Sequence, residues 1–362
     1  MPTYRSDLDR ITRYVPGRGE QEILREYQLD AVIKLASNES PLPPFPEVVA
    51  AIQKAAGGVH RYPETVYTDL AGAVSDHLGV SPENLWFGGG GASLLLHTAL
   101  AVGGPGTSAV YGDPSFVVYR MGTAIAGATS IEVPLDPEHK HDLPAMAAAI
   151  RPDTTVVYIC NPNNPTGTYV PTDAVRRFVS DVSESVLVVV DEAYFEFVDR
   201  SDYRSMVAEA ATSPNMVVMR TFSKIYGLAG LRIGYLVGHP EVLAALRRTQ
   251  LPFTVTSLAQ DAAVESLRHP DEVARRLALN AAGIRHLIEG LVSRGIPVAD
   301  SVTNFVYMRP PIEAATFVEA MLRRGVIIRP TGSPWVRITV GTAAENAACL
   351  AAIGAVLDGE SG

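Results

Sequence analysis

Short runs of β-branched and aromatic residues alternate with amphipathic stretches along most of the chain. Helical periodicity separates most of these runs, as at 115–127 and 172–182. The strand-like runs cover residues 84–89, 107–112, 129–135, 154–160, 185–194, 215–222 and 232–238. The alternation predicts an α/β fold in which a mostly parallel sheet is covered by helices. In such sheets, functional groups gather at the carboxyl ends of the strands.

The pattern changes after about residue 251. Residues 257–295 have helical periodicity and include one long helix. Strand, helix, strand and helix signals then follow to the end of the chain. We therefore expect a large domain at 37–250 and a smaller α+β domain at 251–362. Residues 1–36 are polar and punctuated by Pro and Gly, which predicts an N-terminal arm lying on a surface.

Composition limits the class of protein. A chain of 362 residues that is 47% hydrophobic and 19% charged fits a globular protein of two domains. The net charge of −9 argues against a general nucleic-acid binder, and the Cys and His spacings predict no metal site. Neither a signal peptide nor a membrane span is expected, so a cytoplasmic enzyme is the default. Cys160 and Cys349 give no disulfide framework, and Cys160 is expected to be a small buried residue.

The stretch "RTFSKIYGLAGLRIGY", at 220–235, contains one lysine among hydroxyl groups and a later arginine. The simpler interpretation is a surface lysine and a solvated arginine at the start of a strand. The sharper one is a site for a phosphorylated aldehyde cofactor, with Lys224 forming a Schiff base. Thr221, Ser223 and Arg232 would then bind the phosphate. Pyridoxal phosphate is the candidate for such a cofactor.

Polar residues follow two strand-like runs where a parallel sheet would present them. Asp191 comes after five apolar residues, so its carboxylate needs a cationic partner or hydrogen-bond donors. A helix cap or a turn is the alternative role. A pyridinium nitrogen fits as the partner, and Asn164 and Tyr194 would both bond the ring's phenolate oxygen.

Four glycines, Gly88 to Gly91, precede Ala92 and Ser93 at a predicted junction between a strand and a helix. Glycines allow close backbone approach to an anion, and a helix N-terminus offers free N–H groups. The turn lacks the P-loop lysine pattern and the spaced dinucleotide fingerprint, which disfavours a nucleotide. Phe116 opens the next helix, where it would stack on a flat ring or pack in the core.

A specific resemblance emerges from these motifs taken together. "LASNESP", "HRYPE", "NPNNPTG", "DEAYFEF", the lysine stretch and "VRITVG" occur in the order and rough spacing of fold-type I pyridoxal-phosphate aminotransferases. Within that group the chain resembles the histidinol-phosphate aminotransferases and their aromatic amino acid (phenylalanine) aminotransferase relatives. The match covers nearly the whole chain and is more specific for fold and cofactor than for substrate.

The resemblance implies roles for individual residues. Lys224 matches the lysine that carries the cofactor and shuttles the substrate proton, Asp191 the pyridinium partner, and Asn164 and Tyr194 the phenolate ligands. The phosphate ligands would be Thr221, Ser223 and Arg232 with the backbone around Gly91, Ala92 and Ser93. Tyr62 matches a tyrosine that reaches the cofactor of a neighbouring subunit, which implies a homodimer. The substrate-binding candidates are Arg337, matched to a carboxylate clamp, together with Asn38 and Tyr14.

The resemblance leaves the substrate open. We expect transamination of phenylalanine, tyrosine or tryptophan with 2-oxoglutarate, because three segments depart from the histidinol-phosphate pattern. These segments are "GGGGASLLL", "RPTGSPWVRIT" and "RYVPGRGEQE". Histidinol phosphate is the alternative substrate, and Arg18 and Arg329 would supply its phosphate site. A pyridoxal-phosphate decarboxylase is a further alternative.

A different class of protein is an effector-sensing domain of a transcription regulator. Such proteins carry a DNA-binding module ahead of the aminotransferase-like domain, and no helix-turn-helix pattern precedes "LASNESP". A binding protein without catalysis would also have no use for Lys224 and Asp191 together.

Overall fold

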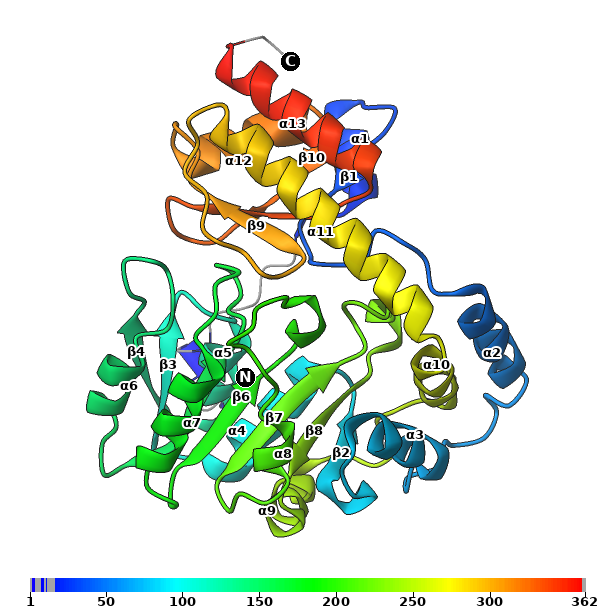
Figure 1. The fold of residues 1–362 in the computed structure, drawn as a ribbon, viewed down its shortest axis with the longest axis vertical. Coiled ribbons are helices and arrows are strands. Elements are labelled where there is room, and N and C mark those ends of the chain that lie inside the picture. Colours follow the sequence, from blue (N-terminus) through cyan, green and yellow to red (C-terminus); the bar gives the residue numbers. More distant parts are fainter. Residues whose placement is uncertain (1, 4–7, 10, 12–16, 360–362) are drawn as a thin grey trace.

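The computed structural model describes residues 2–3, 8–9, 11 and 17–359. The described chain forms a large part around a seven-stranded sheet and a smaller part that lies above it in Figure 1. The long helix α11, Pro270–Val292, runs from the large part into the smaller one (Figure 1). None of the described helices combines the length and the apolar character needed to cross a membrane.

The large sheet has the strand order β2-β8-β7-β6-β5-β3-β4. Strand β8 runs antiparallel to both of its neighbours, and the other pairs in the sheet are parallel. The strands are β2 (Leu85–Gly88), β3 (Ser108–Asp113), β4 (Thr129–Pro134), β5 (Thr154–Cys160), β6 (Leu187–Asp191), β7 (Met216–Thr221) and β8 (Gly234–Gly238). All seven strands expected for the large domain are therefore present, and the predicted fold class is confirmed.

Both faces of this sheet are buried. In β6, Val188 and Val190 pack into the core on one face, whereas Leu187 and Val189 pack into the core on the other. Successive side chains of a strand point to opposite faces, so a continuous apolar run is what a doubly covered strand requires. The helices of the large part are α2 (Pro46–Ala56), α3 (Thr68–Leu78), α4 (Gly91–Val102), α5 (Val118–Ala126), α6 (Leu143–Ala148), α7 (Thr172–Asp181), α8 (Val207–Ala210) and α9 (Pro240–Leu246). The 3-10 helices are η2 (Pro82–Asn84), η3 (Phe195–Phe197), η4 (Ala229–Leu231) and η5 (Arg247–Thr249).

The smaller part combines short strands with helices packed on them. Its antiparallel sheet has the order β11-β12-β9, and β1 pairs with β10 in parallel. The strands are β1 (Ile33–Lys34), β9 (Phe305–Met308), β10 (Val326–Ile327), β11 (Arg329–Pro330) and β12 (Val336–Thr339). Its helices include α1 (Glu20–Tyr27), α12 (Ala314–Arg323) and α13 (Ala343–Leu357), whereas α10 (Ser257–Leu267) packs in the large part.

Two segments differ from the domain boundaries drawn on the sequence. Residues 20–36 do not simply lie on a surface, because β1 pairs with β10 and Ile23 is buried against Leu322 and Ile327. Helix α10 lies beside α3 in the large part (Figure 1), and Ala259, Ala262 and Ala263 join the core on one face of the large sheet. The sequence does not indicate that α10 packs in the large part, because a helix face made of alanines can pack against many different partners.

Candidate active site

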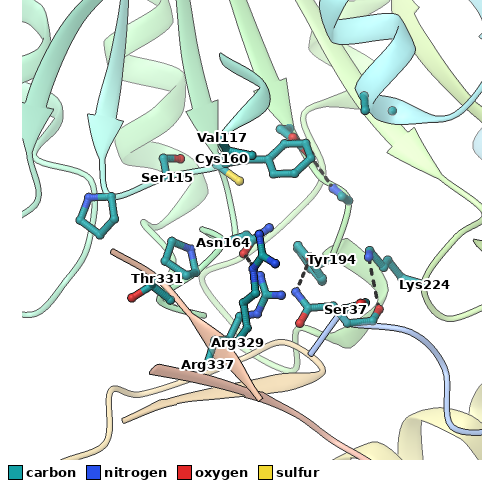
Figure 2. A pocket seen from close by; sticks show the side chains of 18 of the residues that line it. Ser37, Ser115, Val117, Cys160, Asn164, Tyr194, Lys224, Arg329, Thr331 and Arg337 are labelled. Carbon is teal, nitrogen blue, oxygen red and sulfur yellow. Dashed lines mark hydrogen bonds between the residues drawn. The ribbon is translucent and has the colours of Figure 1, made fainter. Parts of the chain in front are cut away.

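A cavity of about 700 Å³ opens at the carboxyl ends of the parallel strands, between the two parts of the molecule. Its walls include the residues that follow β3, β5, β6 and β7, together with the N-terminus of α4. The smaller part contributes Arg329 and Arg337 from β11 and β12 (Figure 2). Of the residues assigned from the sequence, the cavity is lined by Asn38, Gly91, Ala92, Phe116, Asn164, Asp191, Tyr194, Thr221, Ser223, Lys224, Arg232 and Arg337.

Asp191, the last residue of β6, is the buried carboxylate of the site, with 2% of its surface exposed. Its Oδ1 accepts a hydrogen bond from the Ala193 N–H at 3.1 Å, and its Oδ2 accepts one from the Tyr119 hydroxyl at 2.7 Å. Burial raises the pKa of Asp191 to about 6, and the hydrogen bonds from Tyr119 and Ala193 act against that increase. The site thus holds a carboxylate that a nearby cation would stabilise strongly.

Lys224 lies in the loop after β7, and its amine faces the cavity (Figure 2). The amine donates to the main-chain oxygen of Asn38 at 3.2 Å. Loss of solvent lowers the pKa of Lys224 to about 8, and the positive charge of Arg337 lowers it further. A larger fraction of the amine is therefore in the neutral, nucleophilic form than in an ordinary lysine at the same pH.

Asn38 connects the lysine to the rest of the site. Its side-chain amide donates to the Tyr194 hydroxyl at 2.8 Å, and its Oδ1 accepts from the Thr339 hydroxyl at 3.1 Å. Asn38 has a φ of 54°, in the left-handed region that asparagine tolerates better than most residues. The structure places this candidate substrate ligand in the cavity wall, with its side chain bonded to Tyr194 and Thr339.

An anion cradle lies where the glycine turn meets the residues after β7. Gly90 has a φ of 87°, and a Cβ added there would lie 2.4 Å from Nη2 of Arg232. Glycine is therefore required for the guanidinium to lie against the N-terminus of α4. The Thr221 hydroxyl donates to Oγ of Ser223 at 3.0 Å, so both hydroxyl groups are fixed on the same side of the cavity. The cradle combines hydroxyl groups, a guanidinium and a helix N-terminus, which are the groups that bind phosphate.

Arg337 projects from β12 into the cavity and is 8% exposed. Its Nη1 donates to Oδ1 of Asn164 at 2.5 Å, and its Nη2 donates to the main-chain oxygen of Ala36 at 2.7 Å. The guanidinium of Arg329 comes from the neighbouring strand, since Arg329 is in register with Arg337 (Figure 2). Two guanidinium groups thus face the same region of the cavity, where they would bind an anionic substrate group.

Two assigned residues lie outside the cavity. Ser93 is in the first turn of α4 but does not line the cavity. The Tyr62 side chain is 81% exposed outside the cavity and stacks on Phe253 with ring centroids 4.4 Å apart. Tyr14 lies outside the described residues. Phe116, by contrast, is half-buried in the cavity wall, where its ring packs edge-on against Tyr119.

Two supporting features escaped the sequence analysis. Tyr119, which donates to Asp191, lies in an amphipathic helix where a tyrosine has the appearance of a core residue. Glu192 and Arg220 form a buried ion pair at 2.8 Å between the ends of β6 and β7. The available signal was that Glu192 and Arg220 stand next to the candidate site residues Asp191 and Thr221 in the sequence. Their ion pair ties the strand that carries Asp191 to the strand that carries Thr221.

Comparison with known proteins gives matches along the whole chain. A family model described as aminotransferase class I and II matches residues 30–353. Histidinol-phosphate aminotransferase 2 of Ralstonia nicotianae is 42% identical over 356 residues, covering 96% of this chain and 95% of that protein. The aromatic amino acid aminotransferase of Rhodococcus jostii is 41% identical over 350 residues, covering 97% of this chain and 95% of that protein.

A solved structure matches closely as well. Histidinol-phosphate aminotransferase from Sinorhizobium meliloti, in complex with pyridoxal 5′-phosphate, matches with a TM-score of 0.91 and 28% sequence identity. The match covers 100% of this chain and 99% of that one. These findings agree with the resemblance inferred from the sequence motifs.

Proposed function

The chain belongs to the aminotransferase class I and II family, and we propose that it transfers the amino group of aromatic L-amino acids to 2-oxoglutarate. Its substrates are phenylalanine, tyrosine or tryptophan, and its products are the aromatic 2-oxo acid and L-glutamate. Its cofactor is pyridoxal 5′-phosphate, the group named with the Sinorhizobium meliloti structure.

The residues of the cavity fit this cofactor. Thr221, Ser223 and Arg232 with the N-terminus of α4 would hold its phosphate, because the two hydroxyl groups are bonded to each other and Gly90 leaves room for the Arg232 guanidinium beside the helix. Asp191 would pair with the protonated ring nitrogen, which satisfies a buried carboxylate whose two hydrogen-bond donors among the described residues are both neutral. Phe116, in the cavity wall, offers a ring face for stacking.

The bound cofactor supplies an electron sink that stabilises negative charge at the substrate Cα. Lys224 accepts the Cα proton and returns one later, because its lowered pKa lets the amine act as base and then as acid near neutral pH. The Asn38 main-chain oxygen holds the amine on the cavity side of the loop. Tyr194, buried and bonded to Asn38, presents its phenol at the same place.

The placement of Arg337 in the cavity is the observation that carries the proposal, because its guanidinium would bind the α-carboxylate of the substrate. The guanidinium is fixed by Asn164 and by the Ala36 oxygen, so it is oriented before a substrate arrives. Both donor and acceptor substrates of an aromatic aminotransferase carry this carboxylate. Phe116, Val117 and Pro330 add apolar surface to the same cavity, as an aromatic side chain requires.

Histidinol phosphate is the second candidate, and Arg329 is the observation that favours it. Arg329 lines the cavity beside Arg337 and would attract a phosphate dianion. The other arginine considered for this phosphate, Arg18, is bonded to Glu22 at 2.8 Å and also to Glu26, and it does not line the cavity. Of the two arginines considered for this phosphate, Arg329 lines the cavity and Arg18 does not, which favours the aromatic substrates.

The active unit is proposed to be a homodimer. Tyr62 and Leu251 are 81% and 70% exposed, and large exposed apolar side chains that gather around a stacked pair such as Tyr62 and Phe253 mark an interaction surface. By resemblance, Tyr62 would reach the cofactor phosphate of the partner subunit.

A half-reaction tests the proposed function. The cofactor-loaded enzyme, mixed with L-phenylalanine and no 2-oxo acid, is expected to release one phenylpyruvate per active site. Addition of 2-oxoglutarate should then release one glutamate and restore the original absorption spectrum. Absence of phenylpyruvate, in an enzyme that reacts fully with histidinol phosphate, would reject the aromatic assignment.

A further inference from the structure

A tyrosine behind the cavity is bonded to the buried carboxylate. Tyr119 lies on α5 and is 1% exposed, and its hydroxyl donates to Oδ2 of Asp191 at 2.7 Å. The other carboxylate oxygen accepts from the Ala193 N–H at 3.1 Å. Tyr119 does not line the cavity, so it supports Asp191 from the protein side without reaching a ligand.

We propose that Tyr119 is a positioning residue that keeps Asp191 ionised and aimed at the cofactor's ring nitrogen. This inference rests on the proposed function, since it takes pyridoxal phosphate to be the cofactor. Tyr119 would then determine how much more tightly the protein binds a ring with a protonated nitrogen than a ring without one.

The electrostatics of the pair support this direction of hydrogen bonding. Burial raises the pKa of Asp191, and the Tyr119 hydroxyl lowers it by bonding to the charged form. Burial also raises the pKa of Tyr119 well above its usual value, and the charge of Asp191 raises it further. The proton of the pair therefore stays on the phenol, and the carboxylate accepts a charge-assisted hydrogen bond.

The Tyr119 ring is itself held in place. It stacks on Tyr158 with centroids 4.7 Å apart and an interplanar angle of 14°, and Phe116 packs edge-on against it at 5.9 Å. A ring fixed on both sides delivers its hydroxyl to one position. Phe116, three residues before Tyr119 and just ahead of α5, lines the cavity, so a candidate stacking residue and the residue that supports Asp191 lie close together in the chain.

Tyr158 provides a matched control. It is equally buried and belongs to the same stack, yet its hydroxyl has no hydrogen-bond partner among the described residues. Tyr158→Phe and Tyr119→Phe therefore each remove one buried hydroxyl oxygen from the same aromatic stack. Only the second removes a bond to Asp191.

The test compares two ligands in the full-length protein. Dissociation constants are measured for pyridoxal phosphate and for its analogue in which carbon replaces the ring nitrogen. Tyr119→Phe should weaken binding of pyridoxal phosphate about tenfold and leave the analogue within about twofold. Tyr158→Phe should change neither. As the pH is lowered, protonation of Asp191 should weaken the binding of pyridoxal phosphate. In Tyr119→Phe this loss of affinity should begin at a higher pH than in the wild type.

A double-mutant comparison separates this role from a general effect on folding. In an Asp191→Asn background, Tyr119→Phe should cost almost no affinity, because the charge that it supports is gone. An equal loss of affinity for both ligands, a cost that persists in the Asp191→Asn background, or unchanged binding would each overturn the role of Tyr119. If the wild type and Tyr119→Phe bind pyridoxal phosphate equally well, the role of Tyr119 is overturned and the proposed function stands. A wild-type protein that binds neither ligand would overturn both.

Discussion

The amine of Lys224 and the main-chain oxygen of Asn38 lie 3.2 Å apart, although 186 positions separate the two residues in the chain. Asn38 follows β1, which pairs with β10 of the smaller part, whereas Lys224 follows β7 of the large sheet. The contact therefore joins the two parts of the molecule at the lysine. Because the acceptor is a backbone atom, its position depends on the left-handed conformation of Asn38 rather than on a side chain.

We expect the capture of pyridoxal phosphate by the cofactor-free protein to become faster as pH rises through about 8. Only the neutral amine is nucleophilic, and the lowered pKa of Lys224 places its deprotonation near that pH rather than near 10.5. The measurement is the rate of formation of an adduct that borohydride reduces, followed by absorbance between pH 6 and 10. Lys224→Ala serves as the control and should form no such adduct. A rate that keeps rising to pH 10 without levelling would contradict a lowered pKa.

Asp191→Asn should retain the cofactor but slow removal of the substrate Cα proton by about a hundredfold or more. An amide cannot keep the ring nitrogen protonated, so the electron sink is lost. Single-turnover kinetics with deuterated and ordinary phenylalanine measure this step. If turnover falls by less than about tenfold, Asp191 has a structural role only.

Arg337→Ala should raise KM for phenylalanine and for glutamate alike. The two substrates share the α-carboxylate, and removing one partner of a buried charge pair costs about 2–5 kcal/mol, or roughly 30-fold or more in binding. Arg323→Ala is the control, because Arg323 is an exposed arginine of the smaller part that pairs with Glu319. An increase in KM for glutamate without one for phenylalanine would contradict a carboxylate site that both substrates share.

Tyr62 is predicted to act across a subunit interface. A hybrid dimer of a Tyr62→Phe chain and a Lys224→Ala chain should contain one site with both defects and one with neither. Its activity should then approach half that of the wild-type dimer and exceed that of both parent homodimers. Hybrids as poor as the parents would show that each chain supplies its own tyrosine.

The strand ends and the groups that follow them could be predicted from sequence, because a buried strand must be apolar and the polar residue after it marks the edge of the sheet. Asp191 and Asn164 are the candidate residues that this argument predicts. The contact of Lys224 with Asn38 could not be predicted, since it depends on a backbone conformation and on how two parts of the chain meet. The role of Tyr119 could not be predicted, because the hydrophobic pattern of an amphipathic helix is the same whether or not the hydroxyl of its tyrosine forms a hydrogen bond.

The donor preference tests the central claim most directly. The measurement is kcat/KM for L-phenylalanine and for histidinol phosphate, each with 2-oxoglutarate as acceptor, in the wild-type enzyme and in Arg329→Ala. The account predicts a higher kcat/KM for phenylalanine and only a small effect of Arg329→Ala on that value. A higher kcat/KM for histidinol phosphate that is lost in Arg329→Ala would contradict it.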